Sequence, residues 1–129
     1  MFDYRKIIDH DNHLVRIRVS GIVTLADGEL IVSEARSEAS RLKYNILYDC
    51  RGMILHTRIN DLYKTIRNLP VFKETQAFHT RTAILHAPED DNTQYKFYEI
   101  TATNFGLSVQ VFVDETEAFN WVTAATEKE

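Results

Sequence analysis

The sequence predicts an α/β fold: a mainly parallel sheet of four core strands, an N-terminal antiparallel hairpin strand, and helices on the faces. The run Asn45–Arg51 is short and apolar, and it lies between two segments with helical periodicity. Ile46, Leu47 and Tyr48 follow one another without polar alternation, which indicates a strand covered on both faces. Strand-like and helix-like segments then alternate to the end of the sequence, as in parallel α/β sheets.

Composition restricts the class of protein. The 129 residues suit one domain, so residues 1–129 are predicted to form a single unit. The net charge is -4 and the 15 basic residues are scattered, which disfavours nucleic acid as a partner. Cys50 is the only cysteine, which fits a reducing compartment. No segment resembles a signal peptide or a transmembrane segment, so we expect a cytoplasmic protein.

The N-terminal third predicts a hairpin followed by a helix. Tyr4–Ile8 and Leu14–Ser20 flank a polar cluster that is typical of a tight turn. The second arm alternates Val15, Ile17 and Val19 with Arg16 and Arg18, so its arginine face must stay hydrated or find ion-pair partners. Gly21–Thr24 is expected to connect this arm to the helix. Thr24 and Asp27 have the spacing of a capping box, and an apolar stripe follows at Ile31, Ala35, Ala39 and Leu42.

The remaining elements follow from similar signals. Gly52–His56 is expected to be a connection, and the next helix carries Ile59, Leu62, Ile66 and Leu69 before Pro70 ends it. Two interpretations fit residues 71–80: the helix continues after a break, or a short second helix follows it. Thr82–Ala87 predicts a strand, Asp91 or Asn92 can cap a third helix, and Gly106 suits its left-handed end. Val109–Val113 is the last strand, and Asp114 with Glu117 repeats the capping spacing before a fourth helix.

Several segments resemble the SpoIIAA-like family, which is grouped with the STAS domain of anti-sigma-factor antagonists and with a class of lipid-binding domains. The segments are Val19–Thr24, Ile46–Asp49, Thr82–Leu85 and the closing Val111–Val122, which reads V-F-x-D-x-x-E-A-x-x-W-hydrophobic. The resemblance spans nearly the whole chain. It implies a parallel core in the order 2-1-3-4, with Leu14–Ser20 as the first core strand.

That order implies a ligand site. Ligands of such sheets bind beyond the carboxyl ends of the strands where the winding reverses, here between the first and third core strands. Ser20, Gly21, His86 and Ala87 would lie nearest this point, with Asp49, Cys50 and Asp114 along the same rim. We therefore predict Ser20, Gly21, Asp49, Cys50, His86 and Asp114 as ligand-binding residues.

The resemblance also implies a phosphorylation site. The better-understood relatives carry a phosphorylatable serine in an Asp-Ser-x-Gly-like turn that opens the helix after the second core strand. Thr57 is the hydroxyl residue at about that place, without the acid and the glycine of the pattern. A phosphate there would meet the positive end of the helix and the neighbouring Arg58.

Catalytic and metal chemistry are weakly indicated. Cys50, with His56 or His86 as a base, has the residue types of a thiolate nucleophile, but a buried strand-end cysteine usually serves as a small hydrophobic residue. The five histidines lack the spacing of a zinc site. The sequence indicates no catalytic residue, no metal and no cofactor.

The leading hypothesis is a non-enzymatic binding or regulatory domain that takes a protein partner or a small apolar, lipid-like ligand. Two alternatives remain: an anti-sigma-factor-antagonist-like switch with Thr57 as phosphate acceptor, and a small hydrolase or transferase using Cys50 and His86. An open edge strand also favours pairing of two copies as a homodimer, without specifying a surface.

Overall fold

The computed structural model describes residues 2–75 and 80–124, which form a five-stranded sheet with five helices. The elements in chain order are β1 (Phe2–Asp9), β2 (Leu14–Thr24), α1 (Leu25–Leu42), β3 (Asn45–His56), α2 (Ile59–Asn68), α3 (Pro70–Thr75), β4 (Arg81–Leu85), α4 (Thr93–Asn104), β5 (Ser108–Phe112) and α5 (Glu115–Thr123). β1 pairs antiparallel with β2, and the other neighbours are parallel. The predicted α/β class is confirmed.

The strands lie in the order β1-β2-β3-β4-β5, so the predicted core order 2-1-3-4 is wrong. β3 lies between β2 and β4, where a strand that is apolar on both faces can be covered on both sides. β2 carries Arg16 and Arg18 on one face. A strand with two charged side chains is better placed near the edge of the sheet, where these side chains reach water. The winding does not reverse, and β2 and β4 are not neighbours.

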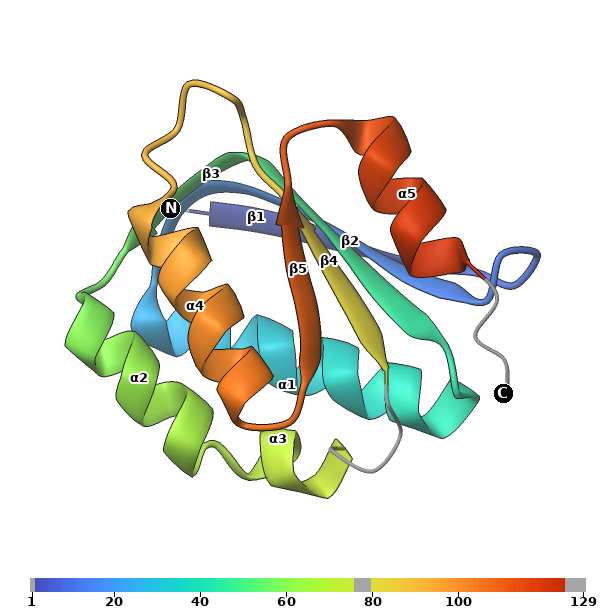
Figure 1. Ribbon diagram of the computed structural model, residues 1–129, viewed down its shortest axis with the longest axis horizontal. Helices are drawn as coiled ribbons and strands as arrows, with labels where there is room; N and C mark the ends of the chain where they lie inside the picture. Colours follow the sequence, from blue (N-terminus) through green and yellow to red (C-terminus); the bar gives the residue numbers. More distant parts are fainter. Residues whose placement is uncertain (1, 76–79, 125–129) are drawn as a thin grey trace.

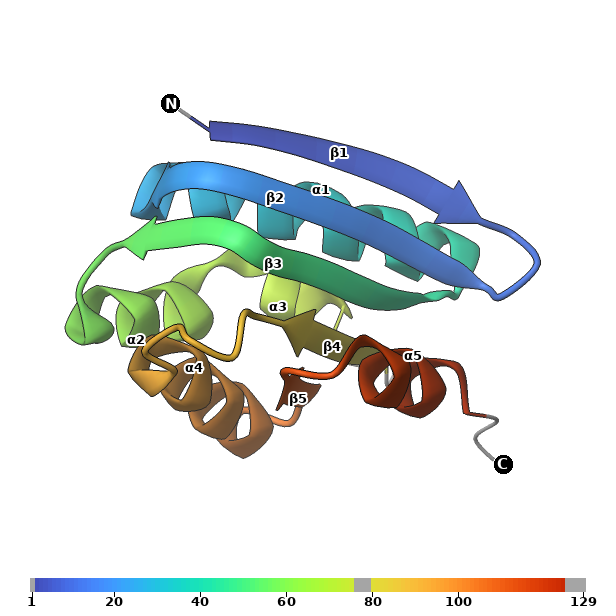
Figure 2. The ribbon, with the colours of Figure 1, turned by 90° about the horizontal axis from the view of Figure 1, so that it is seen from above.

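The sequential order distributes the helices unevenly over the sheet. Parallel crossovers are almost always right-handed, and each crossover here advances in the same direction, so the connecting helices fall on one face. Figure 1 shows α1 to α4 on that face and α5 alone on the other. In Figure 2 the strands follow in order from β1 to β5, and no helix lies in front of β1 and β2.

Two strands extend beyond their predicted ends. Both Gly21–Thr24 and Gly52–His56, expected as connections, continue β2 and β3 and pair with each other. The register advances by one extra residue of β3 between the pairs Arg18–Asp49 and Ser20–Gly52, which is the mark of a β-bulge. Gly21 adopts a φ of 87°, a conformation that favours glycine.

The helix signals were more accurate. Thr24 and Asp27 form the capping box at the start of α1, and Asp114 accepts a hydrogen bond from the Glu117 amide at the start of α5. Gly106 has a φ of 96°, as expected after α4. Of the two readings for residues 71–80, a short separate helix is confirmed by α3, while residues 76–79 lie outside the described part.

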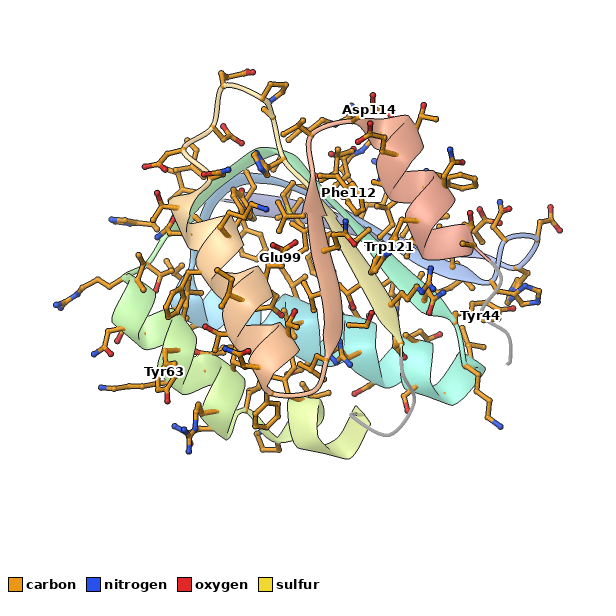
Figure 3. All side chains as sticks on the ribbon, viewed as in Figure 1. Tyr44, Tyr63, Glu99, Phe112, Asp114 and Trp121 are labelled. Atoms are coloured by element: carbon orange, nitrogen blue, oxygen red, sulfur yellow. The ribbon has the colours of Figure 1, made fainter. Side chains whose placement is uncertain are left out.

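The two sheet edges differ. The Glu99 carboxylate lies beside β5 (Figure 3) and accepts a hydrogen bond of 2.7 Å from the Val111 amide, so one outward donor of β5 is already bonded. β1 carries Arg5 and Lys6 at its middle, and central charges on an edge strand disfavour pairing with another copy. Homodimer formation stays a prediction.

Replacement of Leu47 by alanine tests the central position of β3. Leu47 is 3% exposed and packs beneath α5, so Leu47→Ala should lower the free energy of unfolding by about 2–5 kcal/mol, measured by urea denaturation. Ile54→Ala on the same strand is the control, because Ile54 is 64% exposed and should change stability by about 0.5 kcal/mol or less. Equal effects of the two substitutions would contradict the two-sided burial of β3.

Candidate functional site

β3 divides its side chains between two hollows on opposite faces of the sheet. Ile46, Tyr48 and Cys50 belong to the core beneath α1 to α4. Leu47 belongs to the smaller core beneath α5, and Asp49, two residues along, points to the same face. The predicted rim residues Asp49 and Cys50 therefore lie in different environments.

The first hollow, which we call the helix-face cavity, has a volume of about 110 Å³ and lies between the sheet and the helices α1 to α4. Most of its lining is apolar and includes Val19, Val23, Ile31, Leu55, Leu62 and Ile84. Protein interiors are packed so closely that few voids exceed the size of a water molecule. A hollow of this volume, which is partly open to solvent, therefore stands out from the close packing around it.

Helix α2 is joined to its neighbours by two polar contacts beside this cavity. The Thr65 hydroxyl of α2 donates a hydrogen bond of 2.8 Å to Glu29 of α1. The Gln94 side-chain amide of α4 donates to the Thr57 carbonyl just before α2. Glu29, Thr65 and Gln94 all line the cavity, so these polar contacts add to the apolar packing of Leu62 and Ile66 in holding α2 in its wall.

Tyr48 lines the cavity with a buried hydroxyl. Within the described part of the protein, the Tyr48 hydroxyl has no hydrogen-bond partner. Burial raises the Tyr48 pKa, and burial also raises the pKa of the neighbouring Tyr98 to about 12. Because buried polar groups are normally hydrogen-bonded, the unpartnered Tyr48 hydroxyl is an exception among the buried polar atoms.

Cys50 also lines the cavity, and its environment opposes thiolate formation. Cys50 is buried, and this burial raises the thiol pKa to about 12, with a further contribution from the Asp49 and Asp90 carboxylates. A reactive cysteine requires the opposite shift, toward a lower pKa. The geometry gives no support to a Cys50 nucleophile.

His86 is buried just after the end of β4, and its ring is held by a backbone carbonyl and a neighbouring tyrosine. Its Nδ1 lies 2.8 Å from the Ala87 carbonyl oxygen, which can only accept, so Nδ1 carries the proton and donates. Its ring stacks on Tyr95 with centroids 4.7 Å apart. These contacts hold the imidazole in place and occupy one of its two nitrogens.

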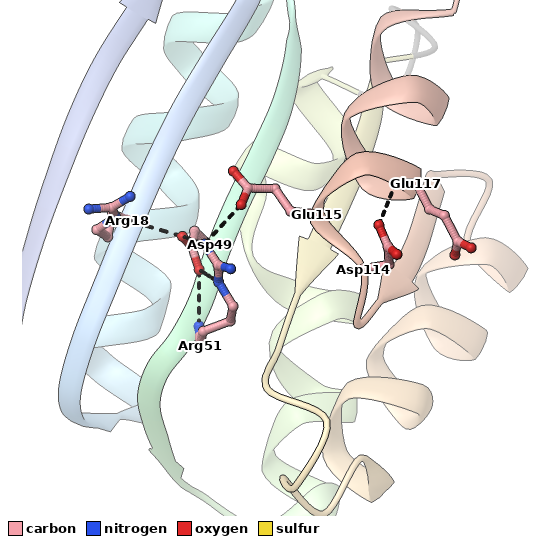
Figure 4. Close-up of polar contacts among 6 residues, drawn as sticks. All are labelled: Arg18, Asp49, Arg51, Asp114, Glu115 and Glu117. Atoms are coloured by element: carbon pink, nitrogen blue, oxygen red, sulfur yellow. Dashed lines mark hydrogen bonds and ion pairs between the residues drawn. The ribbon is translucent and has the colours of Figure 1, made fainter.

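Asp49 is the centre of a charged network on the α5 face (Figure 4). The Arg51 guanidinium donates hydrogen bonds of 2.9 and 2.8 Å to the two carboxylate oxygens, and Arg18 forms an ion pair at 3.7 Å. Arg51 also contacts Glu115 at 3.4 Å. The Arg51 hydrogen bond is the main cause that lowers the Asp49 pKa, against the opposing effect of burial.

The second hollow, which we call the arginine hollow, lies beside this network and also has a volume of about 110 Å³. Arg5, Arg16 and Arg18 line it together with Asp49 and Glu115. The row of cross-strand partners Arg5, Arg18, Asp49, Leu85 and Phe112 runs over all five strands and places the charged groups side by side.

The other predicted residues lie apart from these hollows. Ser20 and Gly21 lie opposite Gly52 and Met53 of β3, because β3 separates β2 from β4. Asp114 is at the start of α5 (Figure 3), where it caps the helix. Thr57 is half-buried in the loop before α2, and its carbonyl accepts from Gln94.

Within residues 2–75 and 80–124, no group of three or more His, Cys, Asp or Glu side chains is arranged to hold a metal ion. No helix in the same part of the chain combines the length and apolar character needed to cross a bilayer.

Several residues that line the two hollows were not predicted from the sequence. Arg5 could have been found from the hairpin, because the tight turn fixes a register that places Arg5 opposite Arg18. The spacing of Tyr48 from Ile46 and Cys50 places its side chain on the α1 to α4 face. No sequence signal relates Glu29, Thr65 and Gln94, since they come from three different helices.

No protein-family model matches the sequence, and no curated protein gives a significant match. The similarity to the SpoIIAA-like family therefore stays a prediction that rests on the segments quoted above.

Alkylation tests the environment of Cys50. The pKa of about 12 leaves almost no thiolate at pH 8, so iodoacetamide should modify the native protein at least about 100-fold more slowly than the urea-unfolded protein. Intact-mass spectrometry over time measures both rates. Rapid alkylation of the native protein would contradict the buried, uncharged thiol.

The Asp49 network predicts a pH-dependent stability. Because the folded pKa of Asp49 lies below its unfolded value of about 3.9, its ion pairs stabilise the protein above that pH and are lost as the pH falls through the folded pKa. Asp49→Asn should therefore cost about 1 kcal/mol at pH 7, and this cost should shrink below pH 4. Urea denaturation of both proteins at pH 7 and pH 3 measures the difference. An equal cost at both pH values would argue against this role.

Proposed function

We propose that the protein is a non-enzymatic binding domain that holds one small apolar molecule in the helix-face cavity. The observation that carries the proposal is a partly open hollow of about 110 Å³ with an apolar lining between the sheet and the four helices α1 to α4. Ligand sites of this kind are mostly apolar and contain a few polar groups that orient the ligand. The unpartnered Tyr48 hydroxyl supplies such a group.

The volume restricts the ligand. An apolar cavity of about 150 Å³ can remain dry and bind benzene. A void of about 110 Å³ therefore suits a molecule of about one six-membered ring or a short branched chain. One oxygen on such a ligand would give the Tyr48 hydroxyl a hydrogen-bond partner.

Two alternative functions remain predictions. A phosphate on Thr57 would lie beside the start of α2, whose N-cap residue Arg58 makes no side-chain capping bond. A hydrolase or transferase based on Cys50 and His86 receives no support from the raised thiol pKa or from the Nδ1 hydrogen bond to Ala87.

Gly28 allows a test that leaves the fold intact. Gly28 lies in α1 and lines the cavity, and the nearest atom that an added Cβ would meet is 3.9 Å away. Gly28→Leu places a side chain in the void, whereas Gly28→Ala adds only one methyl group. Both substitutions replace glycine in a helix, which favours helix formation.

Benzene, phenol and cyclohexanol are suitable probes, and thermal unfolding is the measurement. A ligand at ten times its dissociation constant stabilises the folded state by about 1.4 kcal/mol, which corresponds to a few degrees in Tm. We expect this shift with the wild type and Gly28→Ala, and its loss with Gly28→Leu. Absence of a saturable shift with every probe, or an equal shift with Gly28→Leu, would count against the proposal.

A further inference from the structure

The half of the sheet that α5 leaves open carries exposed apolar and charged side chains. No helix covers β1 and β2 on this side (Figure 2). Ile7 is 51% exposed, and the cross-strand partners Ile22 and Ile54 are 48% and 64% exposed. Ile22 and Ile54 lie side by side, whereas Ile7 lies opposite Arg16, six residues away along β2 from Ile22.

The arginine hollow lies at the border between this open half and α5, and like charges meet on its β1 and β2 side. Arg5 and Arg18 are direct cross-strand partners, and Arg16 is two residues from Arg18 on the same face. Like charges directly opposite each other on neighbouring strands are destabilising. The strands therefore place three arginines close together on one face, where their charges repel one another unless acids lie between them.

The nearby acids compensate this charge only in part. Asp9 pairs with Arg16 and Asp49 with Arg18, each at 3.7 Å, while the hydrogen bonds of Asp49 go to Arg51. Arg5 makes no ion pair with any residue in the described ranges 2–75 and 80–124. The lining holds three arginines against the two carboxylates of Asp49 and Glu115, so it carries one positive charge in excess, although the chain as a whole carries a net charge of -4.

We infer that the arginine hollow is a binding site for a carboxylate group, with Arg5 and Arg18 as its main donors. A guanidinium presents two parallel N–H donors that match a carboxylate. The carboxylates of Asp49 and Glu115 line the same hollow and disfavour a doubly charged anion, so a single carboxylate fits better than phosphate. The site is separate from the helix-face cavity, because it lies on the opposite face of β3.

The carboxylate could belong to a free small molecule or to an acidic side chain of a partner protein. Exposed Ile7 lines the hollow as well, and an acidic residue flanked by apolar ones would contact both features. Acetate therefore serves as the minimal probe, and a short peptide with one glutamate between leucines serves as the second. Phosphate is the third probe.

Titrations followed by amide chemical shifts in ¹⁵N-labelled protein test the site. We expect saturable shifts in β1 and β2 with acetate and with the peptide, and at least a tenfold weaker affinity in Arg5→Gln. Lys64→Gln on α2 is the matched control, since it removes one exposed positive charge elsewhere and should bind as the wild type does. Binding of the peptide at least tenfold tighter than acetate assigns the carboxylate to a partner protein, and similar affinities assign it to a small molecule.

Arg5→Gln carries a second readout that does not depend on a ligand. Removal of one member of the like-charged pair should leave the urea midpoint unchanged or raise it. Absence of saturable shifts with acetate and with the peptide would overturn the inference. Unaltered affinity in Arg5→Gln, or tighter binding of phosphate than of acetate, would do so too.

Discussion

The burial of β3 on both faces is the constraint on which the rest of the structure depends. A central strand must contribute apolar side chains alternately to two cores, and Ile46, Leu47 and Tyr48 satisfy this requirement in succession. The four helices on one side and the single helix on the other then enclose different amounts of the sheet. One face is covered and contains a cavity, and the other is half open and carries charge.

The sequence predicted which face of each strand is buried, but it did not predict which strands pair with each other. Periodicity shows which side of a strand is apolar, so the central strand, the helix stripes and the caps at Thr24 and Asp114 could be predicted. Pairing between strands depends on contacts between residues far apart in the chain, and no local pattern encodes it. The order 2-1-3-4 came from a resemblance, and it placed Ser20 and Gly21 beside β4 although β3 lies between them.

Both hollows were hard to foresee for a related reason. The helix-face cavity is the space left by side chains from seven elements, and its volume depends on how they pack. The prediction that Asp49 and Cys50 lie together on one rim treated them as the end of a strand. In the structure β3 continues to His56, so the two side chains keep their alternation and point to opposite faces.

The two faces nevertheless depend on each other through Asp49. Asp49 is the residue before Cys50, whose side chain lies in the apolar wall of the helix-face cavity. The charge of the Asp49 carboxylate contributes to the raised Cys50 pKa. An unpaired carboxylate at such a position would be costly, because a partly buried charge needs ion-pair and hydrogen-bond partners. Arg51 donates two hydrogen bonds to Asp49, and Arg18 forms an ion pair with it. These guanidinium groups on the open face therefore permit the charged Asp49 at the centre of the sheet. Arg18 and Arg51 are therefore needed on that face because they stabilise the Asp49 carboxylate of β3. Arg5 serves no such requirement, and for this reason it is the residue that most strongly indicates an external anion.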